Sequence, residues 1–338
     1  MWAWGWGAST GPRNGAPVST EGGRRAIIAA ASANLGIAAT KFAAWGVTGA
    51  SSMLAEAIHS TADTGNQLLL MIGGRAAVRE PDEEHPFGYG RARYLAAFMV
   101  AIVLFTLGGL FALYECYEKI MAVRAGEHDA LTESTWWWVP LVVVGISLVA
   151  ESLSLRTALK ETHKARAHLS VLDFIKQAKA PELPVVMLED SAAVLGLVFA
   201  LAGIGLTLLT GNEIFDAVGS GCIGLLLVVV AVILGREMLS LLEGESASPE
   251  NRAAVAEAIS DTSGVDSIIH MRTIHVAPET ILVAAKIAVD PGDSAVGVAR
   301  IIDDAEAAVR AAVPMVGPLY LEPDILRPSP SDADVKEN

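Results

Sequence analysis

The chain has 338 residues, of which 52% are hydrophobic and 18% are charged. Soluble domains carry about a quarter charged residues and disordered chains are poor in apolar ones, so this composition excludes disorder for most of the length and indicates a membrane protein. The net charge of -14 lies mainly in Glu243–Asn338, which holds 17 acidic and 7 basic residues. A chain this acidic is not expected to bind nucleic acid.

The sequence contains two cysteines, Cys116 and Cys222, and neither belongs to a CxxC or Cys/His motif. Disulfide scaffolds and zinc fingers are therefore excluded. Residues 1–25 lack a basic start followed by an apolar core, so they are not an ordinary secretory signal. We expect a flexible tail rich in Gly, Ser and Pro.

Six apolar segments follow, and each approaches the 20 or so residues that a helical membrane span needs. The predicted spans cover about 26–47, 51–74, 93–115, 136–156, 183–210 and 216–238. Four contain long uncharged stretches, whereas the first is interrupted by Lys41 and the second by Glu56, His59 and Asp63. A buried helix of a soluble domain is the alternative for these two, but their short connections to clear spans disfavour it.

Lysine and arginine in the loops predict the orientation, because cytoplasmic loops carry an excess of both. Thirteen lie in the first tail and in the connections between spans two and three and between spans four and five, against two on the other side, Lys119 and Arg124. Both termini are therefore expected in the cytoplasm.

The end of the chain has the pattern of a small soluble domain over residues 243–326, followed by a polar tail over 327–338. Ser248 is a plausible N-cap for the first helix. The predicted order is helix, strand, strand, helix and strand, at Pro249–Asp261, Ser267–Val276, Ile281–Val289, Ser294–Val313 and Pro318–Glu322. This order indicates an α+β domain with one open sheet.

Span two carries five polar side chains on one helical face, and ionisable groups inside a membrane are costly enough to imply function. They are Glu56, His59, Asp63, Asn66 and Gln67. His59 and Asp63, four residues apart, can direct an imidazole and a carboxylate at one point, which is half of a tetrahedral zinc site. A proton relay or a packing hydrogen bond is the alternative for this pair.

Spans four and five add further carboxylates. Glu189 and Asp190 are adjacent, so only one is expected to face the same site readily, and Asp190 is favoured. Glu189 is then left to bind a proton, cap the helix entrance or pair with a loop arginine. Glu151 has either a transport role or an interfacial position with its carboxylate drawn toward water.

The runs KFAAWGVTGASSMLAEAIHSTADTGNQ and HPFGYGRARYLAAFMVAI closely resemble the cation diffusion facilitator family of divalent-metal transporters. The segment HMRT from His270 and LEPD from Leu321 resemble the family's C-terminal domain, so the resemblance covers residues 20 to 325. It implies six spans with a ferredoxin-like cytosolic domain, a homodimer, and export of zinc or a related divalent ion in exchange for protons. The protein is then a secondary transporter and not an enzyme.

The resemblance also implies a metal site made of one ligand pair in span two and one in span five. His59 and Asp63 match the first pair and Asp190 matches the second, but Val186 stands where a His or Asp is usual. The segment LEDSAAVLG resembles the zinc-transporter-nine-like branch, in which that His is also absent. The shell is then three protein ligands with water, or it recruits Glu189 or Glu151.

Glu56 and Asn66 are further candidates for metal binding or proton coupling. A secondary loop site would use Asp82 and His85, although Tyr89 occupies the position of its third ligand.

In the C-terminal domain His270 matches a family ligand, but Lys286 stands at its partner position and argues against a metal. His163 and His168 are expected to be solvated in a basic loop.

The interpretation is a multi-pass carrier of an inner or plasma membrane that moves Zn²⁺, with protons as the counter-ion. Manganese, iron, cobalt and cadmium are alternative cargoes. The missing ligands at Val186 and Lys286 motivate a second hypothesis, a non-transporting membrane scaffold or metal sensor. An intramembrane enzyme is disfavoured, because no nucleophile accompanies His59 and Asp63 at a usual spacing.

Overall fold

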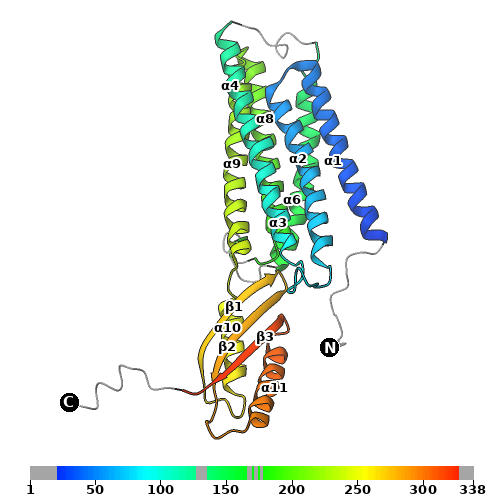
Figure 1. Ribbon diagram of the computed structural model, residues 1–338. Helices are drawn as coiled ribbons and strands as arrows, with labels where there is room; N and C mark the ends of the chain where they lie inside the picture. Colours follow the sequence, from blue (N-terminus) through cyan, green and yellow to red (C-terminus); the bar gives the residue numbers. More distant parts are fainter. Residues whose placement is uncertain (1–20, 127–134, 166–169, 171–173, 176–177, 327–338) are drawn as a thin grey trace, which may run out of the picture.

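The computed structural model describes residues 21–126, 135–165, 170, 174–175 and 178–326. A bundle of long helices stands on a small sheet domain (Figure 1). The bundle consists of α1 (Glu21–Thr48), α2 (Ser51–Ala77), α3 (Ala92–Val103), the π-helical η1 (Leu104–Leu110), α4 (Phe111–Arg124), α6 (Val139–Ala165), α8 (Glu182–Thr210) and α9 (Ile214–Glu243). Most of the predicted N-terminal tail, His168 and the polar tail from 327 lie outside the described residues.

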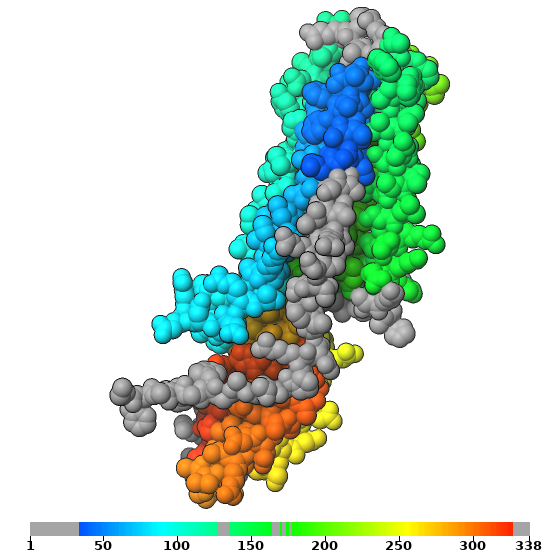
Figure 2. Space-filling view, turned by 90° about the vertical axis from the view of Figure 1, so that its right-hand side faces the viewer, coloured from blue at the N-terminus to red at the C-terminus, as the bar shows by residue number. Residues whose placement is uncertain are grey.

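Four helical stretches in the described part of the chain are long and apolar enough to cross a membrane, at Ala92–Arg124, Val139–His163, Glu182–Thr210 and Ile214–Glu243. They correspond to predicted spans three to six, so the chain is a multi-pass membrane protein. The helices α1 and α2 coincide with the two interrupted segments, and α1 lies against both α2 and α6 (Figure 2). The count of six spans stays a prediction.

Two glycines close the tight connections between neighbouring helices. Gly49, with φ of 68°, follows α1, and Gly211, with φ of 71°, follows α8. Both angles lie in the left-handed region that only glycine adopts without strain. The Gly211 N–H also donates to the Thr207 carbonyl at 2.8 Å and ends the helix. These turns place α2 beside α1 and α9 beside α8.

Glycines also allow α9 to approach the long helix formed by α3, η1 and α4. A Cβ added to Gly109 would lie 2.6 Å from a methyl carbon of Val228, and one added to Gly224 would lie 2.8 Å from the Leu113 backbone nitrogen. Membrane helices pack through small residues in this way, because lipid tails are as apolar as leucine and the helices gain contact only by close approach.

The C-terminal domain contains α10 (Pro249–Ser260), β1 (Ser267–Ala277), β2 (Thr280–Ala288), α11 (Ala295–Ala312) and β3 (Val316–Asp324). The sheet order is β1-β2-β3, with β1 antiparallel and β3 parallel to β2. Ser248 accepts a hydrogen bond from the Asn251 N–H at 3.2 Å, which confirms the predicted N-cap. The predicted element order and bounds agree with the structure to within a few residues.

The hairpin between β1 and β2 joins this domain to the membrane bundle. Gly90, between α2 and α3, lies so close to the hairpin that an added Cβ would be 2.3 Å from the Ala277 Cβ. The His275 N–H donates to the Glu245 carbonyl at 2.8 Å, and the Glu245 side chain pairs with Lys179. Backbone contacts and an ion pair therefore hold the hairpin against one end of the helical bundle. The loop charges predict that this end faces the cytoplasm.

We expect Gly224→Ala to lower the melting temperature in detergent, because the added methyl forces α9 away from Leu113 and overpacking costs about 1–3 kcal/mol. The matched control is Gly205→Ala on α8, where no atom lies within 4 Å of an added Cβ. The control is expected to be neutral or slightly stabilising. Equal melting curves for the two variants would contradict the close packing of α4 and α9.

Candidate metal centre

The polar face of α2 points into the bundle, as its spacing predicts. The side chains of Glu56 and Asn66 are fully buried and His59 is 1% exposed, whereas Asp63 is partly open at 16%. Buried polar groups in a bundle of this kind need partners, because unsatisfied hydrogen-bonding groups are costly in an apolar medium. The partners divide the face into layers along the helix.

Lys41 of α1 supplies the partner for Glu56. Its Nζ lies 2.9 Å from Glu56 Oε2 and donates to Ser60 Oγ at 2.7 Å, and the pair is 0–1% exposed. A buried ion pair of this kind is broken only at a large cost, since removal of one charge leaves the other uncompensated. Glu56, a candidate for metal binding or proton coupling, thus already has a fixed cationic partner.

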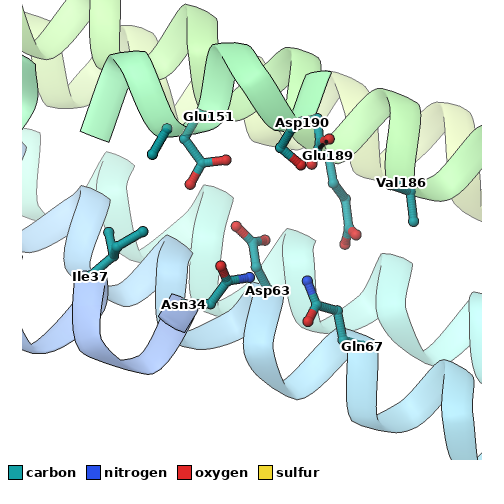
Figure 3. Close-up of a pocket in the computed structure, with 10 residues that line it drawn as sticks. Asn34, Ile37, Asp63, Gln67, Glu151, Val186, Glu189 and Asp190 are labelled. Carbon is teal, nitrogen blue, oxygen red and sulfur yellow. Dashed lines mark hydrogen bonds between the residues drawn. The ribbon is translucent and has the colours of Figure 1, made fainter. Parts of the chain in front are cut away.

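A cavity of about 90 Å³ lies between α1, α2, α6 and α8 (Figure 3). Its lining consists of Asn34, Ile37, Asp63, Gln67, Ala150, Glu151, Ser154, Val186, Glu189 and Asp190. The structure therefore brings together Asp63 and Asp190, two of the three predicted ligands, with both candidate extra carboxylates. Figure 3 shows Glu151 and Asp190 on one side of the cavity and Asp63 on the other.

The expectation that only one of Glu189 and Asp190 readily faces the site is wrong, because both line the cavity. Val186 lines the cavity as well, and residues three and four positions further along a helix flank its direction on either side. Glu189 accepts a hydrogen bond from Asn66 Nδ2 at 2.6 Å and is 6% exposed. This partner is neither the loop arginine nor the helix entrance that the sequence suggested.

His59 lies next to Asp63 but is not part of the cavity lining. Its Nδ1 is 3.5 Å from Asp63 Oδ1, and neither ring nitrogen has a hydrogen-bond partner among the described residues. Asp190 Oδ2 accepts from Ser154 Oγ at 2.8 Å. In the part of the chain that is described, no three His, Cys, Asp or Glu side chains are grouped closely enough to hold a metal ion. A metal ion held by His59, Asp63 and Asp190 would therefore require these side chains to move closer together.

Sequence reasoning missed two features. Asn34 of α1 lines the cavity, and its only signal was an amide within an apolar segment. Asp216 of α9 is fully buried and receives the Ser51 N–H at 2.7 Å, the Ser51 hydroxyl at 3.0 Å and the Ser52 hydroxyl. Asp216 is the first residue of predicted span six. An acidic residue at the start of a membrane span was the sequence signal that could have identified it.

The loop candidates Asp82 and His85 lie close together on the surface, with His85 Nδ1 3.7 Å from Asp82 Oδ1. Tyr89 donates its hydroxyl to Asp82 Oδ2 at 2.6 Å, and its ring stacks at 4.2 Å from that of His85. The hydrogen bonds from Tyr89 and from the His85 backbone lower the pKa of Asp82. Tyr89, at the position of the third ligand, thus occupies one oxygen of Asp82 with its phenol hydroxyl.

Lys286 lies across the strand pair from His270. Its ammonium is 2.9 Å from Glu322 and 3.1 Å from Asp324. Hydrogen bonds to these two carboxylates raise the pKa of Lys286. Lys286 is therefore a cation held by two carboxylates at the position opposite His270, and the absence of a metal there stays a prediction.

Comparison with known proteins gives a family. Residues 27–242 match the model of the cation efflux transmembrane domain. The chain is 36% identical over 230 residues to the mitochondrial proton-coupled zinc antiporter SLC30A9 of Xenopus laevis and 35% identical to that of Homo sapiens, which is 68% of this chain. It spans about two fifths of the length of these relatives, 40% and 39%.

Metal tolerance protein C4 of Arabidopsis thaliana is 29% identical over 272 residues, which cover 80% of this chain and 58% of that protein. A solved variant of the MamM C-terminal domain is 26% identical and covers 23% of this chain and 93% of its own, with a TM-score of 0.22. The span matched by the family model includes the motifs around His59 and Gly90. The chain therefore belongs to the cation efflux, or cation diffusion facilitator, family, in its zinc-transporter-nine-like branch.

Proposed function

We propose that this protein exports a divalent cation, with zinc as the favoured cargo, from the cytoplasm in exchange for protons. The observation that carries the proposal is the cavity in which Asp63 of α2 faces Asp190 of α8. Beside it lies the imidazole of His59, whose ring nitrogens have no hydrogen-bond partner among the described residues. Two carboxylates neutralise a divalent charge inside a low-dielectric bundle, and zinc accepts carboxylate and imidazole ligands. The names of the antiporter relatives support both zinc and the proton as coupled ions.

Competition between metal and protons for the same atoms gives the exchange a physical basis. A ligating imidazole must be neutral and a ligating carboxylate ionised, so metal binding expels protons and protonation expels metal. His59 is the proposed carrier, because a ring nitrogen of an imidazole can hold either a proton or a metal ion. Among the described residues, its ring nitrogens have no hydrogen bond to break before they accept either ion.

Two polar layers separate His59 from the N-terminal end of α2. The first is formed by Lys41 with Glu56 and Ser60, and the second by Asp216 with Ser51 and Ser52. All of these side chains are buried. If α2 begins on the far side of the membrane, as the loop charges predict, these layers close the exit in this conformation. Release then requires α1, α2 and α9 to separate there.

Asp63→Asn is expected to abolish zinc-driven proton flux in proteoliposomes while folding is kept, because the amide has the same shape but lacks the charge that binds the cation. The measurement is the fluorescence of a pH dye trapped inside vesicles after zinc is added outside. Asp303→Asn, at an exposed position of α11, is the matched control and should transport like the wild type. Normal flux through Asp63→Asn would remove this residue from the site.

We also propose that the protein is a homodimer joined through the open face of the C-terminal sheet. Ile281, Val283 and Ile287 of β2 pack with the helices of the domain, so the alternate residues face away from them. Tyr320 is paired with Ala284 in the register, shares this second face and is 55% exposed. An aromatic side chain on an uncovered sheet face suits a contact with a second copy of the chain.

Tyr320→Glu is expected to weaken the dimer of the full-length protein in detergent, because the contact would bury an unpaired charge. The control is Val296→Glu on α11, which is 63% exposed and lies on the helical side of the domain. Light scattering after size exclusion gives the mass of each variant. A monomeric wild type, or equal masses for both variants and wild type, would contradict this interface.

A further inference from the structure

The cavity contains a carboxylate that the two-pair metal site leaves without a role, on the helix that lacks one of its donors. Val186 lines the cavity but offers only methyl groups to a cation. Glu189 and Asp190 follow it at three and four positions, so all three lie on one side of α8. From this geometry we infer that Glu189 is the fourth metal donor, in place of the one missing at Val186, and that Asn66 positions it. The inference rests on the proposed function.

The length of the glutamate side chain makes this substitution feasible. Glu189 has one methylene more than Asp190, and in Figure 3 its carboxylate extends from α8 toward the side of the cavity that holds Asp63 and Gln67. The side chain thereby brings a donor from α8 toward α2. There, Asp63 Oδ1 has no hydrogen-bond partner among the described residues. The lost imidazole or carboxylate at 186 is thus replaced from the same helix face.

Asn66 holds this carboxylate by one oxygen only. Its Nδ2 donates to Glu189 Oε1 at 2.6 Å, and no bond to the other oxygen of Glu189 appears among the described residues. The remaining oxygen is free to ligate while the amide keeps the side chain extended. Hydrogen bonds of this kind, from a neighbouring side chain to a ligand, orient metal ligands, and their loss lowers affinity by roughly 10–100-fold.

A comparison of the two buried glutamates separates a structural role from a ligand role. Glu56 has the ammonium of Lys41 at 2.9 Å as its countercharge. Glu189 is also buried, yet its hydrogen-bond partner is the neutral amide of Asn66, and none of the ion pairs among the described residues includes it. A buried anion without a cation is costly, and a divalent ion in the cavity would supply the missing charge.

The donor set has a consequence for cargo. Three carboxylates with one imidazole are richer in oxygen than a site with an imidazole at 186 would be. Oxygen ligands suit manganese, whereas imidazole suits zinc. The wild type should therefore discriminate less between zinc and manganese than a variant that carries the imidazole.

The test titrates zinc chloride and manganese chloride into purified full-length protein in detergent, against a chelating dye at fixed pH. Glu189→Gln keeps the size of the side chain but removes its charge, and is expected to weaken zinc binding by about tenfold or more. Glu182→Gln is the matched control on the same helix, because Glu182 pairs with Arg93 outside the cavity lining. It should bind zinc like the wild type.

A double-mutant cycle tests the positioning role of Asn66. Asn66→Ala alone is expected to weaken zinc binding by about tenfold. In the Glu189→Gln background the same change should have no further effect, because Asn66 acts through the carboxylate that is already lost. Additive losses would show that Asn66 does not act through Glu189 and would overturn this part of the inference.

A rescue completes the test. Val186→His in the Glu189→Gln background should restore zinc binding and raise the zinc-to-manganese ratio above that of the wild type. If melting curves show that Glu189→Gln is unfolded, Glu189→Asp replaces it, because the shorter side chain keeps the charge but withdraws it from the cavity. It should also lose affinity.

Wild-type zinc affinity in the folded Glu189 variants, together with loss of binding in Asp63→Asn, would overturn the inference and leave the proposed function intact. Wild-type affinity in both would mean that the proposed site itself is wrong.

Discussion

The need of buried carboxylates for a positive partner governs this structure. Within a helical bundle of low polarity an isolated anion is far more costly than in water, so each one is paired, hydrogen-bonded or placed where a cation can reach it. Glu56 has Lys41, and Asp216 has the hydroxyls and the first amide of α2. At the cavity, Glu189 has the amide of Asn66 and Asp190 has the hydroxyl of Ser154 in place of a cation.

The polar residues of α2 therefore have different roles at successive positions along the helix. Its first turn is held to α9 through Asp216, its second layer is locked to α1 through Lys41, and only its next turns face the cavity. The polar groups that hold the helices together and those proposed to bind cargo thus lie at successive depths along α2. A carrier that changes access has to break the holding contacts on one side, and the buried ion pair of Lys41 and Glu56 is costly to separate.

The domain below the bundle meets the same helices at their ends. The hairpin of β1 and β2 contacts Gly90 just before α3, and Glu245 connects the hairpin with Lys179 ahead of α8. Arg93 of α3 donates to Glu182, the first residue of α8, at 2.8 Å. Movement of the sheet domain would therefore reach α8, which carries Glu189 and Asp190.

Local sequence signals were sufficient for much of this. The spacing from Glu56 to Asn66 predicts the buried face of α2, and the residue pattern of Ser267–Val276, before a turn around Pro278, predicts β1. Contacts between distant segments were not predictable in this way. The bond between Ser51 and Asp216 joins residues 165 positions apart, and the presence of both Glu189 and Asp190 in the cavity depends on where α2 lies around α8. A helical wheel gives directions but not the position of the neighbouring helix.

X-ray absorption of zinc bound to the full-length protein is the most direct test of the central claim, that the cargo cation is the countercharge of the cavity carboxylates. The account predicts a single zinc with nitrogen and oxygen neighbours at about 2.0–2.2 Å and the scattering of one imidazole. A sulfur neighbour at about 2.3 Å, or a shell of several imidazoles, would place the ion at other residues and contradict it.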